Sequence, residues 1–272
     1  MMGDVLPKPS DGFAWVQAAP GPALVCRALE PYAAHLFTTQ SWPLGTASDG
    51  DRTAAWADVT DALGAGADLV RVHQVHGVRV VACKRADVAH QQTATSTSRR
   101  LLEADIIVSD DPSCVLAVQA ADCVPLLMAD SRTGAVAAAH AGWRGLAAGV
   151  PRAAVAALTE AFGSRPADLI AAVGPSISAA RYEVDDIVRA AFVRAGHDER
   201  QLGRWFLDGT RPAHWQFDGW ASARDQLAHA GVGSARIHVS GLCTASHPGT
   251  LPSYRRDGKG AGRIAAAIRA RR

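Results

Sequence analysis

The sequence predicts a mixed β-sheet system with intervening helices, in an α+β or layered α/β fold built as a single domain. Three observations predict it. The 272 residues are 48% hydrophobic, which is enough to enclose a large core. Short apolar runs cluster between residues 104 and 139, before the first long helical pattern. The regular alternation of strands and helices that is typical of a parallel α/β fold is missing.

The first third of the chain is expected to hold short elements. Residues 1–11 are predicted to form a flexible tail, and residues 12–272 a single domain. Proline-broken apolar segments predict strands and turns over residues 15–39, followed by a loop over 41–51 and a short helix that stops at residues 64–66. Residues 69–81 are expected to form a β-hairpin or two consecutive strands interrupted at His76. The polar residues 91–100 predict an exposed loop.

The remaining elements follow from apolar periodicity. Strands are predicted at residues 106–108, 114–118, 125–129, 135–139, 169–173 and 236–240. Helices are predicted at residues 146–162, 184–195, 220–230 and 262–270.

Composition excludes several classes of function. The net charge is only +2, and no basic run carries interleaved aromatic residues, so we expect no nucleic-acid partner. No stretch of ~20 apolar residues predicts a membrane span, and the first 20 residues lack a signal-peptide core. Five cysteines, an odd number without any CxxC pair, favour a reducing, cytoplasmic location. The sequence gives no signal for the oligomeric state.

Three soft metal ligands stand where a predicted strand meets Gly or Asp. His140 follows the small apolar run 134–139, His76 precedes Gly77, and Cys123 follows Asp122. Three protein ligands with one open position are typical of a catalytic zinc site. In that case the Asp122 carboxylate is a candidate partner for a ligand histidine. The ordinary structural interpretation is two hydrogen-bonded histidines and one buried, inert cysteine.

The same residues also permit nucleophilic catalysis. Cys123, activated by His140 or His76, is a candidate nucleophile, with backbone amides of residues 142–145 as an oxyanion hole. This alternative predicts a Cys/His hydrolase or amidase, acting for example on a peptidoglycan precursor. It differs from the metal hypothesis in one respect, because a nucleophile keeps working in the presence of a chelator.

Three further side chains are candidates for substrate binding. Arg144 begins the predicted helix, where it could bind an anion together with free amide groups, or serve only as a surface cation. Trp143 could stack on an aromatic ligand or pack in the core. Arg255 lies in a polar turn, residues 253–258, that is expected to close over the pocket.

Several motifs together resemble one known family. Residues 74–77 read Gln-Val-His-Gly, residues 121–123 Ala-Asp-Cys, residues 140–145 His-Ala-Gly-Trp-Arg-Gly, residues 174–177 Gly-Pro-Ser-Ile and residues 253–256 Ser-Tyr-Arg-Arg. The chain thereby resembles the bacterial YfiH-like, laccase-domain-containing proteins, formerly called multicopper polyphenol oxidases or laccases.

The resemblance implies a single YfiH-like catalytic domain with an α+β fold, a layered α/β/β/α sandwich in which helices lie outside mixed β-sheets. It further implies a zinc-dependent enzyme that takes purine nucleosides and phosphate. The expected reactions are phosphorolysis of adenosine, inosine or methylthioadenosine, and deamination of adenosine. In the family the matching His, Cys and His bind the metal, which makes His76, Cys123 and His140 the expected zinc ligands and catalytic residues.

The sequence departs from the family near the N-terminus. Members usually carry an Arg after a Thr-Thr pair, and an Asn-Arg pair on the next helix. Gln40, Ala55 and Trp56 occupy the corresponding places here. Because of this departure, a zinc-binding protein that has lost turnover is a further alternative.

Copper is the less favoured metal on sequence grounds. None of the ten histidines is two residues from another, so the His-x-His pairs of four-copper oxidases are missing. Zinc suits the His and Cys donors, and a single copper ion is a weaker alternative.

Overall fold

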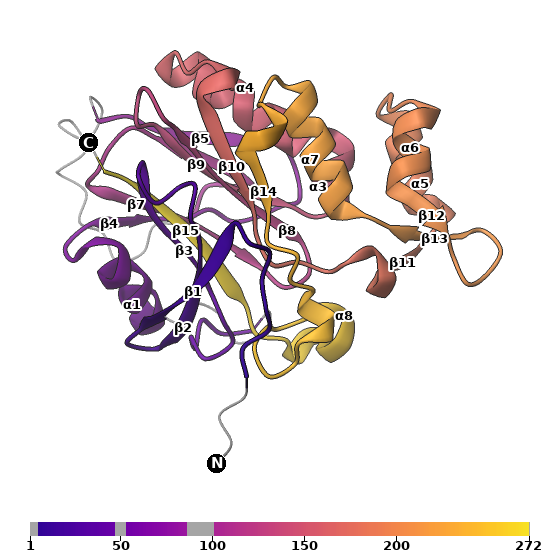
Figure 1. Cartoon of the computed structure of the whole chain (residues 1–272), viewed down its shortest axis with the longest axis horizontal. Helices are drawn as coiled ribbons and strands as arrows, with labels where there is room; N and C mark the ends of the chain where they lie inside the picture. The colour runs from indigo at the N-terminus through magenta and orange to yellow at the C-terminus, as the bar shows by residue number, and fades with distance from the viewer. Residues whose placement is uncertain (1–4, 47–52, 86–100, 272) are drawn as a thin grey trace.

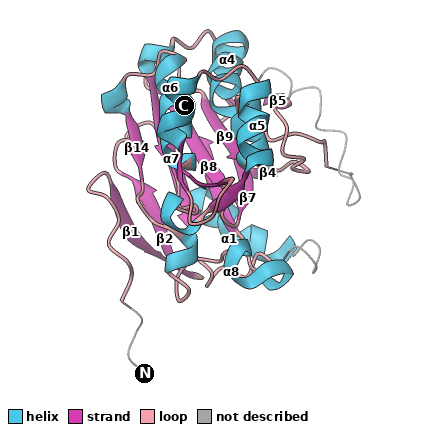
Figure 2. Cartoon of the chain, turned by 90° about the vertical axis from the view of Figure 1, so that its right-hand side faces the viewer, coloured by secondary structure: helices cyan, strands magenta, loops and turns pink. Residues whose placement is uncertain are grey.

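Two six-stranded sheets lie face to face, with helices on both outer surfaces (Figure 1). The computed structural model describes residues 5–46, 53–85 and 101–271. Figure 2 shows the helices α4, α5, α6 and α7 gathered on one side of the sheets. The predicted α/β/β/α sandwich with mixed sheets is therefore confirmed.

The first large sheet, sheet 1, is antiparallel except at one edge, where β4 pairs with β7 in parallel. Its strands in spatial order are β1 (Phe13–Ala18), β2 (Gly21–Cys26), β3 (Ala33–Thr38), β15 (Ile264–Ala270), β7 (Cys114–Ala120) and β4 (Asp68–Val70).

The second large sheet, sheet 2, is mixed, with parallel pairs at both edges. Its strands in spatial order are β14 (Ile237–Val239), β10 (Leu169–Val173), β8 (Val124–Asp130), β9 (Val136–Ala141), β6 (Ile106–Ser109) and β5 (Val80–Cys83). A small third sheet contains β11 (Glu183–Asp185), β13 (His214–Phe217) and β12 (Phe206–Asp208).

The central strands are apolar on both faces because each face is covered. In β8, Leu127 and Ala129 pack toward sheet 1, whereas Leu126 and Met128 pack toward the helices. Side chains alternate across a strand with a period of two, so a doubly covered strand needs an unbroken apolar run. This explains why the runs in residues 106–139 stand out in the sequence.

The helices flank the sheets in two layers. Helix α1 (Thr53–Gly64) covers sheet 1 through Trp56 and Val59. The other long helices, α4 (Val150–Phe162) and α7 (Gly219–His229), pack on sheet 2 together with α3 (Trp143–Ala148). Helices α5 (Asp186–Arg194) and α6 (Glu199–Trp205) lie beside the small sheet, and α8 is Tyr254–Asp257. In the described part of the chain, no helix is long and apolar enough to cross a bilayer.

The helix predicted over residues 146–162 is two helices. Gly149 has φ 90°, in the left-handed region that favours glycine, and it ends α3 and caps α4. Pro151, in the first turn of α4, fixes the second start. The sequence pattern missed this break because apolar spacing continues across it.

The helix predicted over residues 262–270 is wrong, because this segment is the strand β15. Its alanines have high helix propensity, but β15 pairs with β3 on one side and β7 on the other. Small side chains allow both faces of the strand to be covered closely. Tertiary packing overrides the local preference.

Of the two alternatives predicted for residues 69–81, the two consecutive strands are confirmed and the hairpin is wrong. The strands are β4 in sheet 1 and β5 in sheet 2, so the segment between them crosses from one sheet to the other. The predicted helix at 184–195 begins later, at Asp186, because Val184 belongs to β11 and Asp185 caps the helix.

The other predicted strands and helices are confirmed within a few residues at each end. The predicted loop 91–100 lies outside the described residues. The tail boundary at residue 11 stays a prediction; Ser10 hydrogen-bonds to the Val239 and Ser240 carbonyls.

Candidate metal centre

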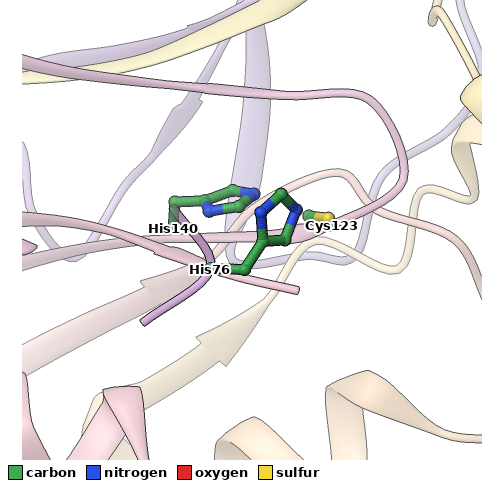
Figure 3. Close-up of side chains that lie close together, drawn as sticks. All are labelled: His76, Cys123 and His140. Atoms are coloured by element: carbon green, nitrogen blue, oxygen red, sulfur yellow. The ribbon is translucent and has the colours of Figure 1, made fainter. Parts of the chain in front are cut away.

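His76, Cys123 and His140 come together where the chain passes between the two large sheets. Their ligand atoms all lie within 4.8 Å of one another. Figure 3 shows the two imidazole rings and the thiol close together. The ring centroids of His76 and His140 are 4.9 Å apart, with an interplanar angle of 81°. One metal ion can therefore contact all three side chains.

One donor, and the residue directly before another, sit at strained backbone positions. His76, in the crossing between β4 and β5, has φ 61°, and Asp122, directly before Cys123, has φ 83°. Non-glycine residues rarely adopt such angles, and they cluster at functional sites. The tight turn at Asp122 joins β7 of sheet 1 to β8 of sheet 2 and places the thiol at the junction.

His140 is held by Asp105, a residue that sequence reasoning did not single out. Asp105 immediately precedes β6, which pairs with β9, so the two residues are neighbours across the sheet. Nδ1 of His140 donates to Oδ1 of Asp105 at 2.8 Å. This hydrogen bond fixes the ring and leaves Nε2 as the metal donor.

The same carboxylate also holds the loop that carries His76. It accepts backbone N–H groups from Val75, His76 and Gly77 at 3.2, 3.1 and 2.6 Å. Burial opposes ionisation of Asp105, but these bonds and the His140 contact lower the pKa of its carboxyl. Asp105 therefore positions both histidines.

The prediction that Asp122 orients a ligand histidine is wrong. Its carboxylate accepts hydrogen bonds from Thr244 Oγ1 and the Arg255 backbone N–H, both at 2.6 Å. Asp122 instead joins the Cys123 turn to the C-terminal loops. A signal for Asp105 existed in the sequence, since an acidic residue at the start of a buried strand needs polar partners.

The Cys123 thiol and the His140 imidazole shift each other's pKa. Burial raises the pKa of the Cys123 thiol, but His140 and then His76 outweigh burial and lower it. Burial lowers the pKa of His140, but the charges on Cys123 and Asp105 raise it. The thiolate form, which is the form that binds metals, is thus favoured.

Gly142 lies against the donors. A Cβ atom at this position would be 2.9 Å from Cys123 Sγ and 2.9 Å from His76 Cδ2. A glycine is therefore needed for the backbone to pass this close to the ligand atoms.

A cavity of about 890 Å³ opens over the three donors. Its described lining includes all three predicted substrate residues, Trp143, Arg144 and Arg255. The Arg144 guanidinium lies 4.1 Å from the Trp143 ring centroid, and the Arg255 guanidinium lies 4.8 Å from that of Tyr182. From the sequence, Arg144 is a candidate for binding an anion together with free amide groups at the start of its helix. Because α3 has only six residues, the contribution of its N-terminus to anion binding is weak.

The cavity also contains residues that the sequence analysis did not assign to the site, although Gln74 belongs to one of the family motifs. Arg71, Gln74, Tyr182 and Arg263 line it. Gln74 forms two hydrogen bonds with the backbone of Gln119, of 2.8 and 2.7 Å, which tie its loop to β7. None of these residues stands in a periodic pattern, so only the fold could bring them together.

Gln40, Ala55 and Trp56 stand where family members usually carry Arg, Asn and Arg, and they differ in their surroundings. The Gln40 backbone N–H donates to the Thr250 carbonyl, and its side chain is exposed. Ala55 and Trp56 are buried in the layer between α1 and sheet 1.

Comparisons with known proteins agree with the motifs. The family model described as "Multi-copper polyphenol oxidoreductase laccase" matches residues 44–271. The chain belongs to this family. Its YfiH-like character is confirmed by the crystal structure of Bacillus licheniformis YfiH, which matches with a TM-score of 0.82 at 28% identity, covering 94% of this chain and 99% of that one.

Two further members of the YfiH-like family extend the comparison. A purine nucleoside phosphorylase from Deinococcus radiodurans is 36% identical over 263 residues, which cover 92% of this chain and 94% of the relative. YlmD from Geobacillus stearothermophilus matches with a TM-score of 0.79 at 28% identity, covering 95% of this chain and 99% of that structure. The sequence resemblance and its implied fold are therefore confirmed.

Proposed function

We propose that this protein is a zinc-dependent purine nucleoside phosphorylase that also deaminates adenosine. The observation that carries the proposal is the convergence of His76, Cys123 and His140 within 4.8 Å at a cavity lined by aromatic and cationic side chains. The relative from Deinococcus radiodurans named as a purine nucleoside phosphorylase supports the same activity.

The donor set fits zinc. Zinc takes His nitrogens and Cys thiolates, and catalytic sites use three protein ligands and keep one position open. Of the described residues, these three form the one cluster of His, Cys, Asp and Glu close enough to hold a metal ion. Copper is the less favoured metal, since a one-cysteine, two-histidine set with an open position is typical of catalytic zinc.

The chain's own residues perform the remaining tasks. When bound, zinc would supply Lewis acidity toward an oxygen of water or phosphate. Asp105 keeps His140 in one tautomer and orientation. Trp143 offers a ring face for the purine, and Arg144 and Arg255 offer guanidinium groups for an anion.

The two reactions leave different products. In phosphorolysis, a phosphate oxygen bonds to the anomeric carbon of the ribose while the bond to the purine nitrogen breaks, giving ribose 1-phosphate and the free base. In deamination, water replaces the amino group of adenosine, giving inosine and ammonia. Chromatography of adenosine incubated with the protein, with and without phosphate, distinguishes them.

The decisive experiment uses the zinc-loaded chain. We expect adenine in the presence of phosphate, inosine with or without it, and about one zinc per chain. Cys123→Ala should lose both the zinc and the products, whereas Cys83→Ala, outside the cavity, should keep both. Full zinc loading without any product would support the zinc-binding protein that has lost turnover.

A second candidate rests on the electrostatics of the same residues. The lowered pKa of Cys123, with His140 beside it and Asp105 behind His140, is also the arrangement of a cysteine hydrolase or amidase. A chelator distinguishes the zinc enzyme from the cysteine hydrolase, because only the zinc enzyme needs the metal. Activity that survives zinc removal, with iodoacetamide labelling of Cys123, favours the hydrolase.

We place the proposed activity in the cytoplasm. All five cysteines are free thiols, and Cys123 must stay reduced to act as a ligand.

A further inference from the structure

The cavity wall is strongly cationic away from the three donors. Its described lining includes four arginines, namely Arg71, Arg144, Arg255 and Arg263, but one carboxylate, that of Asp122. Both oxygens of that carboxylate already accept hydrogen bonds. Such a wall favours a ligand with negative charge, which a neutral nucleoside lacks.

Arg71 differs from the other three arginines in its place on the cavity wall. It directly follows β4 at the edge of sheet 1. Val70 and Val72 pack between the sheets, and Leu69 packs toward α1. Because side chains alternate along an extended chain, Arg71 points to the α1 side, where its guanidinium lies 4.1 Å from the ring centroid of Trp56.

Stacking on Trp56 suits anion binding. The Trp56 ring is only 2% exposed and therefore fixed, and it contacts the flat face of the guanidinium. The N–H groups of an arginine lie in the plane of the guanidinium, in a fork that matches the oxygens of a phosphate group.

We propose that Arg71, positioned by Trp56, binds a phosphate group at the wall of the cavity formed by β4 and α1. This inference rests on the proposed function, in which inorganic phosphate is the co-substrate. The same chemistry would recognise a phosphate that the nucleoside itself carries. Arg71 is then a binding residue, and Trp56 a positioning residue.

Calorimetric titration of the zinc-loaded, full-length chain tests the proposal. The probes are inorganic phosphate, adenosine 5′-monophosphate and, as the uncharged reference, adenosine. Arg71→Met should weaken binding of a phosphate-bearing probe about tenfold or more, because it removes hydrogen bonds to a charged group. Arg71→Lys should recover part of the loss, and adenosine affinity should stay within about twofold of wild type.

Variants of Trp56 must separate an effect on the position of Arg71 from an effect on folding. Trp56→Phe keeps a ring face and should bind phosphate nearly as wild type does. Trp56→Leu should weaken phosphate binding but leave adenosine binding unchanged. Arg224→Met is the matched control, since Arg224 is exposed on α7 outside the cavity, and it should change nothing.

The outcomes are distinct. Tight binding of inorganic phosphate assigns the site to the co-substrate, and tight binding of adenosine 5′-monophosphate alone assigns it to a phosphorylated substrate. A folded Arg71→Met variant that binds both probes like wild type overturns the inference, as does a wild type that binds neither. Phosphorolysis with an unchanged KM for phosphate in Arg71→Met, together with unchanged binding of adenosine 5′-monophosphate, defeats this inference alone. Phosphate binding through Arg71 without any purine product defeats the proposed function alone.

Discussion

Asp105 hydrogen-bonds to His140 Nδ1 at 2.8 Å and to three consecutive backbone N–H groups around His76. One buried carboxylate thus joins β6, β9 and the crossing between the sheets.

Asp105→Asn should weaken zinc binding roughly 10- to 100-fold, the range for loss of a partner that orients a ligand. The amide keeps the shape but cannot accept all of these hydrogen bonds. Zinc affinity is measured by competition with a chromophoric chelator. Asp61→Asn, at an exposed position on α1, is the control. An unchanged affinity in Asp105→Asn would show that Asp105 does not position the donors.

Gly142→Ala should also damage the metal centre while leaving the fold intact. The added Cβ would be 2.9 Å from Cys123 Sγ, so the thiol must move away from the two imidazoles. We expect zinc affinity to fall by roughly tenfold or more, as for other disturbances of ligand geometry. Gly203→Ala, on an exposed part of α6 with open space around the new atom, should bind zinc like wild type. Equal zinc affinity in the two variants would contradict the prediction.

His35 should make the protein sensitive to acid. Burial lowers the pKa of His35 to about 4, and its Nε2 accepts the Cys26 N–H. As the pH falls from 6.5 toward 4, the unfolded chain binds a proton at His35 that the folded chain does not. The contribution of His35 to the free energy of unfolding is therefore fully present above pH 6.5. It is lost as the pH falls toward 4, by up to about 3 kcal/mol.

His35→Gln keeps an acceptor but removes the titration. Urea unfolding of wild type and variant at pH 7 and pH 4.5 checks the prediction, because all other titrating groups are shared. His229→Gln, at an exposed position, is the matched control. A wild type and a His35→Gln variant with the same dependence would rule out His35 as the cause.

Ala267→Leu should lower the free energy of unfolding by about 1–3 kcal/mol, the usual effect of overpacking. Ala267 is fully buried on the face of β15 that packs against α1. Ala156→Leu, at an exposed position on α4, is the control and should be nearly neutral. Urea unfolding compares the two. An Ala267→Leu variant with an unchanged free energy of unfolding would instead fit the helix that the local sequence predicts.

The strands of sheet 2 could be predicted because their burial on both faces leaves a visible apolar run. The position of β15 could not, because Ala-rich segments prefer helices in isolation and only the neighbours β3 and β7 make this one a strand. The break at Gly149 was hidden for a related reason: a single glycine does not interrupt the apolar spacing of 146–162.

The donor residues could be singled out because His and Cys next to Gly or Asp at strand ends are unusual. Their convergence could not be derived from spacing, since His76 and Cys123 lie in separate crossings between sheets. The contribution of Asp105 and the stacking of Arg71 on Trp56 depend on strand register and sheet-to-helix packing. The stacking leaves no local pattern in the chain, and the one local signal for Asp105 is an acidic residue at the start of a buried strand.

The central position of β15 has a consequence during synthesis. β15 follows every other described strand in the chain, yet it joins β3 to β7. While a ribosome is still making the chain, β1–β3 and the β7–β4 pair remain two unconnected pieces with bare edges, which invite aggregation. Completion of sheet 1 therefore waits until residues 264–270 have been made, and loss of these residues would separate β3 from β7.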